Sequence, residues 1–158
     1  MKNTIIIGKD GLLRQIDLRN YYMGEAAKRK DIDAVTIQSS KDDEELLYMF
    51  MTKACNELVT AVALRFPFIS TSTDNDELGI TFETECEYPS YLLPLLQQSI
   101  TDYLVNEVTA QWLLTRRPEM AQSHISLRAA LYSNVQQMFA KIYGRRRIRR
   151  RATDLAGI

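Results

Sequence analysis

The sequence has few of the residues that build metal and disulfide sites. Its 158 residues include two cysteines, Cys55 and Cys86, and one histidine, His124. The cysteines lie far apart and form no Cys-x-x-Cys pair, which is typical of a reduced, intracellular protein and indicates neither a zinc site nor a disulfide framework. A single histidine excludes a histidine-rich metal site. We therefore expect no metal and no cofactor.

Glycine is also scarce, and the six glycines form no phosphate-binding pattern. The sequence contains no Walker loop, no dinucleotide-binding glycine pattern and no nucleophile elbow. A Ser–His or Cys–His pair would have to be assembled by the fold, so enzymatic activity is the least favoured function class. We expect His124 on or near the surface of a helix, and we expect no enzyme.

Long apolar runs are missing too. No segment reaches the roughly 18 apolar residues that a membrane span needs. Ile5-Ile6-Ile7 is followed at once by Gly8-Lys9-Asp10, so the N-terminus lacks the apolar core of a secretion signal. We expect a protein of the cytoplasm without membrane contact.

Charge is balanced in total but divided unevenly along the chain. Residues 1–144 carry 14 basic and 19 acidic residues, whereas residues 145–158 carry six arginines against Asp154. The arginine segment, residues 145–151, contains Arg145, Arg146, Arg147, Arg149, Arg150 and Arg151. Electrostatic affinity for nucleic acid grows with the number of phosphates neutralised. Any phosphate binding must therefore come from this basic C-terminal tail.

Three interpretations of the arginine segment remain open. It is a solvated tail, a nuclear localisation signal, or a contact with nucleic acid or an acidic protein surface. The guanidinium fork suits both phosphate and carboxylate, so the sequence does not separate these two partners.

Three long helices are predicted from apolar residues that recur at three- and four-residue spacings. The first spans about 42–65, begins after Ser40 with acidic residues in its first turn, and ends at Pro67. The second begins near 90–93, with Pro94 in its first turn, and runs to about 115. The third spans about 119–143, and Gly144 is its predicted C-cap.

The remaining segments predict short β-structure and irregular chain. We expect an edge strand at 4–7 with a turn at 8–11, a helix near 21–29 that is preceded by irregular chain, and a β-like piece at 32–37. Residues 70–76 are predicted to form a polar loop. Residues 78–87 alternate with period two and predict a strand with one acidic face, in which Gly79 marks a bulge.

Two groups of residues are candidates for subunit interfaces. Glu83, Glu85 and Glu87 share one strand face, which is either a solvated edge or an acidic strip that meets a basic partner, such as the arginine segment of a neighbouring copy. Tyr48, Met49 and Met51 give the first long helix more apolar surface than one core stripe needs, so either the helix is buried on two sides or part of it faces a partner.

We therefore predict a mainly α (α+β) fold: a small helical bundle of three long helices with a short β-hairpin or edge strands and a basic C-terminal tail. Residues 1–144 form one domain, whose first 40 residues are a β or irregular extension, and residues 145–158 are the tail.

The order of these elements points to a family. An acid-capped helix is followed by a loop, a strand, a helix containing Tyr103-Leu104-Val105 and Gln111-Trp112-Leu113-Leu114, an Arg116-Arg117-Pro118 break, and a last helix. Over roughly residues 40–145 this order resembles the small head–tail connector (adaptor or neck) proteins of tailed bacteriophages.

The resemblance implies a virion structural protein without enzymatic activity. Such connectors form a closed ring, often of about twelve subunits, between the portal and the tail or neck proteins, and the genome passes through it. On this implication the arginine segment contacts the portal or the genomic DNA, and the protein is found in the virion neck and, during assembly, in the host cytoplasm. A ring would repeat the segment and form a dense positive collar.

The alternative is a small DNA-binding regulatory protein that uses its basic C-terminal tail. Its last two helices would form a helix-turn-helix, but the last helix offers only Arg128, Gln136, Gln137 and Lys141 for reading a groove.

Overall fold

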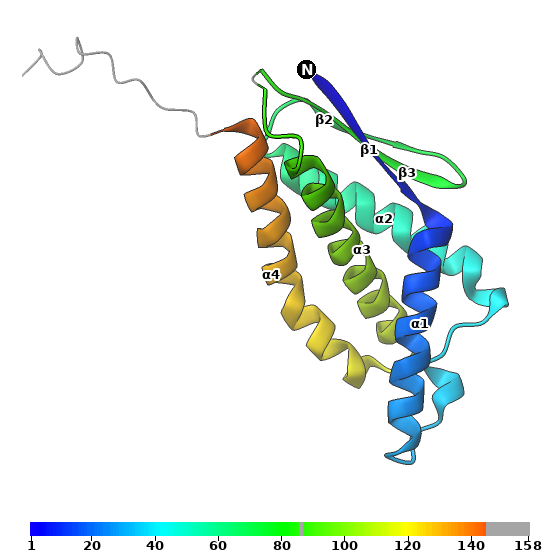
Figure 1. The fold of residues 1–158 in the computed structure, drawn as a ribbon. Helices are drawn as coiled ribbons and strands as arrows, with labels where there is room; N and C mark the ends of the chain where they lie inside the picture. The colour runs from blue at the N-terminus through cyan, green and yellow to red at the C-terminus, as the bar shows by residue number, and fades with distance from the viewer. Residues whose placement is uncertain (86, 145–158) are drawn as a thin grey trace, which may run out of the picture.

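Four long helices and a three-stranded antiparallel sheet make up the computed structural model, which describes residues 1–85 and 87–144 (Figure 1). The helices are α1 (Lys9–Lys28), α2 (Glu44–Ala63), α3 (Leu92–Arg116) and α4 (Pro118–Tyr143). The strands are β1 (Lys2–Gly8), β2 (Ile69–Thr73) and β3 (Glu77–Glu83). The predicted mainly helical fold class is confirmed.

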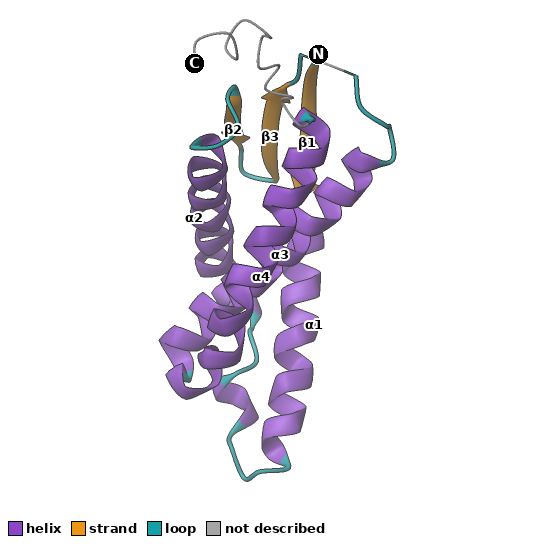
Figure 2. Cartoon of the chain, turned by 90° about the vertical axis from the view of Figure 1, so that its left-hand side faces the viewer, coloured by secondary structure: helices purple, strands orange, loops and turns teal. Residues whose placement is uncertain are grey.

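Helix α3 is the centre of the molecule. All eight residues from Tyr103 to Ala110 are buried, which requires neighbours on every side of the helix. Helices α1, α2 and α4 supply them, and α3 runs between its partners in both views (Figures 1 and 2). Trp112 and Leu113 extend this buried stretch toward the α3–α4 turn.

The sheet lies at one end of the bundle (Figure 2). Strand β3 is central and pairs antiparallel with β1 and with β2, so that Ile80 lies between Ile5 and Thr71. The Phe82 ring contacts the Phe139 ring of α4 edge to face, with centroids 5.5 Å apart. This contact joins the sheet to the C-terminal half of α4.

The three predicted long helices are confirmed within about two residues at each end. A short 3₁₀ turn, Lys41–Asp43, leads into α2. Pro94 is the third residue of α3 and Pro118 is the first of α4, positions at which the missing N–H costs no helical bond. Gly144 follows α4 with a φ of 73°, a left-handed value that favours glycine at a helix end.

The N-terminal prediction was wrong in part beyond the first strand, because the helix expected near 21–29 is only the C-terminal part of a longer helix, α1. Strand β1 pairs with β3 of the same chain, but residues 8–11 form no turn and α1 begins directly at Lys9. The inward positions of α1 include Asn20 and Gly24 beside Leu12 and Ile16. Because these polar and small residues interrupt the apolar period, the sequence predicted only the last part of this 20-residue helix.

Two further local predictions were also wrong. Residues 34–36 form a 3₁₀ turn instead of a β-like piece, because the Asp33 carboxylate accepts a hydrogen bond from the Val35 N–H. Residues 70–73 of the predicted loop 70–76 belong to β2 on the sheet edge, and only residues 74–76 connect it to β3.

Gly79 marks a close approach of strands rather than a bulge. The pairing of β3 passes through Gly79 without interruption on both sides. A Cβ at this position would lie 2.4 Å from the Ser72 Oγ and 2.7 Å from its carbonyl oxygen. The glycine is therefore required by packing against β2.

No helix within the described part of the chain has the length and apolar character that crossing a membrane requires.

Candidate assembly surfaces and the polar contacts that frame them

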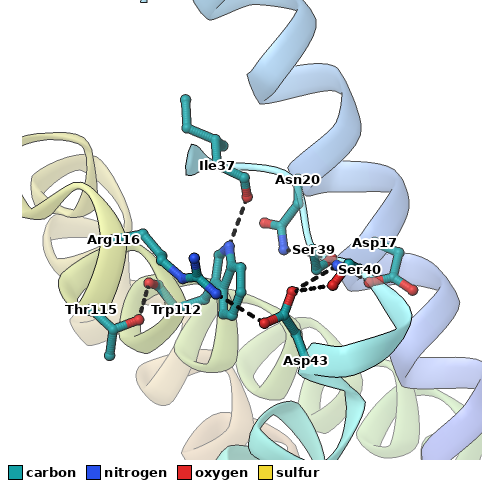
Figure 3. Close-up of polar contacts among 9 residues, drawn as sticks. All are labelled: Asp17, Asn20, Ile37, Ser39, Ser40, Asp43, Trp112, Thr115 and Arg116. Carbon is teal, nitrogen blue, oxygen red and sulfur yellow. Dashed lines mark hydrogen bonds and ion pairs between the residues drawn. The ribbon is translucent and has the colours of Figure 1, made fainter. Parts of the chain in front are cut away.

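The linker between α1 and α2 is fastened to the end of α3 by polar contacts (Figure 3). The buried Trp112 indole N–H donates to the Ile37 carbonyl at 2.7 Å. The Arg116 guanidinium lies 4.6 Å from the centre of the Trp112 ring and donates to Asp43 at 2.9 Å. Helix α3 thus holds the linker and the start of α2 in one place.

Asp43 is held as a carboxylate by its surroundings. Burial alone would raise its pKa, but hydrogen bonds from the Ser40 backbone N–H and hydroxyl, together with the charge of Arg116, lower the pKa below its usual value. The reciprocal bonds between Ser40 and Asp43 form a capping box, which confirms Ser40 as the N-cap of this helical segment.

Two polar pairs join α3 to α4. The Asn106 amide donates to the His124 carbonyl at 2.9 Å, and its Oδ1 lies 2.9 Å from the His124 Nδ1. Since Oδ1 is an acceptor, the Nδ1 carries the proton. Glu107 is almost fully buried and accepts from Arg128 twice, at 2.7 and 2.9 Å.

His124 is half-buried and serves this helix contact. Burial lowers the pKa of His124, and the positive charge of Arg19 on α1 lowers it further. Arg128, one of the few side chains that could read a DNA groove, is already engaged by Glu107.

Among the described residues, no three His, Cys, Asp or Glu side chains lie close enough together to hold a metal ion. The Cys55 thiol is in the core, and burial raises its pKa to about 11. Cys86 lies outside the described residues.

An exposed apolar stripe runs along the outer face of α1. Leu18, Tyr21 and Tyr22 are each more than half exposed, and their spacing of three and four places them on one helix face. Leu18 and Tyr22 also line a groove of about 530 Å³ that reaches Val105 of α3. Sequence reasoning missed this surface, although the spacing of the three residues was a usable signal.

The predicted interface residues of α2 have three different environments. Met51 is fully buried in the core, so its prediction as an interface residue was wrong: its apolar side chain packs within its own chain. Tyr48 is half-buried and donates to Asp10 of α1 at 2.7 Å, a bond that raises its pKa to about 12. Met49 is 57% exposed and lines a surface depression.

The predicted glutamates lie along a groove of about 470 Å³ between the sheet and the end of α4. Strand β3 ends at Glu83, so Glu85 and Glu87 lie in the chain that follows the strand rather than on a longer strand face. All three are exposed. The groove, called the acidic groove below, also contains Phe68, Tyr88 and Tyr143.

The six arginines of residues 145–151 lie outside the described residues. Gly144, immediately before them, lines the acidic groove.

The chain matches no known protein family, and no curated protein or solved structure is significantly similar to it.

Proposed function

We propose that the protein is a virion structural protein, a head–tail connector that forms a ring between portal and tail. The observation that carries the proposal is the exposed stripe of Leu18, Tyr21 and Tyr22 on α1. The core of the subunit is complete without it, and clustered large apolar side chains on a surface are typical of a protein contact.

Ring closure needs two different surfaces on each subunit, because a head-to-tail contact repeats by rotation. The α1 stripe is one candidate surface. The other is formed by α2 and its C-terminal end, where Met49 on the helix and Leu64 just after it are 57% and 85% exposed. Tyr48 of α2 contacts Asp10 near the start of α1, and the stripe lies further along α1. Met49 and two of the stripe residues line different surface depressions, so the two candidate surfaces are separate.

In a ring, the arginine segments would bind the DNA in the lumen or an acidic surface of the portal. Six arginines repeated around a ring bind phosphate or carboxylate far more strongly than one copy does. The body of each subunit is mildly acidic, so the positive charge would be confined to one collar.

The alternative of a free-standing DNA-binding regulator receives less support. The last helix would need free side chains to read a groove, but Arg128 is bound to Glu107, and Gln136 bonds with Tyr132 and Arg65.

Substitutions that introduce negative charge into the α1 stripe test whether this surface forms the contact between subunits. We expect the wild-type chain to grow in mass with concentration by light scattering, and Leu18→Glu with Tyr22→Glu to stay monomeric, because carboxylates in an apolar contact are costly. Leu127→Glu is the matched control, since Leu127 on α4 is 52% exposed. The proposal fails if the double variant assembles like the wild type.

A further inference from the structure

The acidic groove has the composition of a site for a guanidinium-rich peptide. Three carboxylates, of Glu83, Glu85 and Glu87, lie along it together with the aromatic side chains of Phe68 and Tyr88. Arginine suits such a surface because its planar head bonds to carboxylates and stacks on aromatic rings.

The carboxylates of the groove are available to a partner. Among residues 1–85 and 87–144, none of the three glutamates has a cationic side chain within 4 Å. Arg65 and Lys141 also line the groove, and the guanidinium of Arg65 donates to Gln136 at 3.3 Å.

The aromatic part of the groove is both fixed and exposed. The Tyr143 hydroxyl donates to the Pro67 carbonyl at 2.8 Å, which anchors the end of α4 to the chain before β2. The next residue, Phe68, has a φ of 61°, and its side chain is 71% exposed. A large aromatic side chain on a left-handed residue is unusual, and here it is directed to solvent beside carboxylates.

We propose that the acidic groove binds the arginine segment, residues 145–151, of the same chain. Gly144 is part of the groove wall, so Arg145 is covalently attached at its rim. Seven extended residues span about 23 Å, enough to cross a groove of this size. In Figure 1 the end of α4 lies beside the loop that follows β3.

Tethering favours the chain's own segment over that of another copy. A short flexible connection gives an effective concentration in the millimolar range, far above that of a second molecule in dilute solution. In the free subunit the arginines are then bound to the carboxylates of the groove. Another phosphate or carboxylate surface must compete with these carboxylates to bind the arginines. This inference does not depend on ring assembly.

A labelled peptide of residues 144–158 tests the site by fluorescence anisotropy at low salt. We expect it to bind a chain that ends at Gly144, in which the groove is vacated, and to bind the full-length chain at least tenfold more weakly. Every described helix, strand and core residue lies before Gly144, and thermal unfolding monitors the fold of each chain.

Matched charge variants assign the binding to the groove. In the shortened chain, Glu83→Gln, Glu85→Gln and Glu87→Gln together should weaken peptide binding at least tenfold. Asp42→Asn, Glu45→Gln and Glu77→Gln remove the same charge from exposed positions elsewhere and should leave it within about twofold.

Three results would overturn the proposal. The first is a shortened chain that does not bind the peptide. The second is equal weakening by the two triple variants, which would indicate general electrostatic attraction. The third is equal affinity of the shortened and full-length chains, which would show that the groove is not occupied by its own segment and is open to a neighbouring copy.

Discussion

At the residue scale, the contact between Glu107 and Arg128 is the most demanding polar pair of the fold. The Glu107 carboxylate is buried, whereas Arg128 is partly exposed. Both hydrogen bonds between them join a cationic donor to an anionic acceptor, and such charge-assisted bonds are stronger than neutral ones. Burying a carboxylate without a partner is costly. The pair therefore makes the fold sensitive to loss of the arginine.

Arg128→Ala tests this sensitivity. We expect it to lower the free energy of unfolding by about 3 kcal/mol, at the low end for a broken buried pair, because Gln111 still donates to Glu107 at 3.3 Å. Urea unfolding measures the loss. Adding Glu107→Gln to Arg128→Ala should recover most of it, and a variant as stable as the wild type would show that the pair is dispensable.

His124 gives the fold a predictable response to acid. Its pKa in the folded chain is lowered from 6.5, first by burial and then by Arg19, so the unfolded chain takes up a proton at higher pH than the folded chain. Stability from this residue is full above about 6.5 and falls as the pH drops from there through the folded pKa.

The response is measured by urea unfolding at pH 7.5 and pH 5.5. We expect the wild type to lose stability on acidification and His124→Asn to lose less, since the asparagine amide replaces the Nδ1–H donor toward Asn106 without titrating. Equal losses in the two proteins would assign the acid response to other groups.

At the element scale, the sheet depends on the contact between Gly79 and Ser72. Gly79→Ala would place a methyl group against the Ser72 Oγ and carbonyl oxygen. We expect the strands to separate locally at a cost of about 1–3 kcal/mol, seen as a lower thermal midpoint. Adding Ser72→Ala should restore part of the loss, because the carbonyl contact remains; an unchanged midpoint for Gly79→Ala would refute the close packing of β2 on β3.

The sequence predicted those helices in which the buried residues are apolar and recur at three- and four-residue spacings. Helices α2, α3 and α4 each carry apolar residues at helical spacing and clear end signals, and all three were found. Only the last part of helix α1 was predicted, as a helix near 21–29, because Lys9, Asn20 and Gly24 occupy inward positions earlier in the helix and within it. Strand β2 was missed because it is a polar edge strand, whose pairing with β3 is a tertiary property.

The candidate surfaces were predicted less completely than the fold. The exposure of Met49 and of the three glutamates fits the sequence pattern. Met51 was misassigned because α2 has apolar residues on more than one face, and the sequence does not reveal which face packs against α3. The acidic groove needs the end of α4 beside β3, a long-range contact that no local pattern contains.

At the scale of the whole molecule, the basic C-terminal tail begins next to the exposed glutamates of the acidic groove. The described body places three exposed carboxylates beside Gly144, where the arginine segment begins. The stripe on α1 lies on a different part of the surface, so the proposed subunit contact and the proposed groove contact can be varied separately.

Native mass spectrometry of the full-length chain over a concentration series tests the proposed ring assembly. We expect one closed oligomer of about twelve subunits whose population grows with concentration. A chain that remains a monomer or a dimer at every concentration would contradict it.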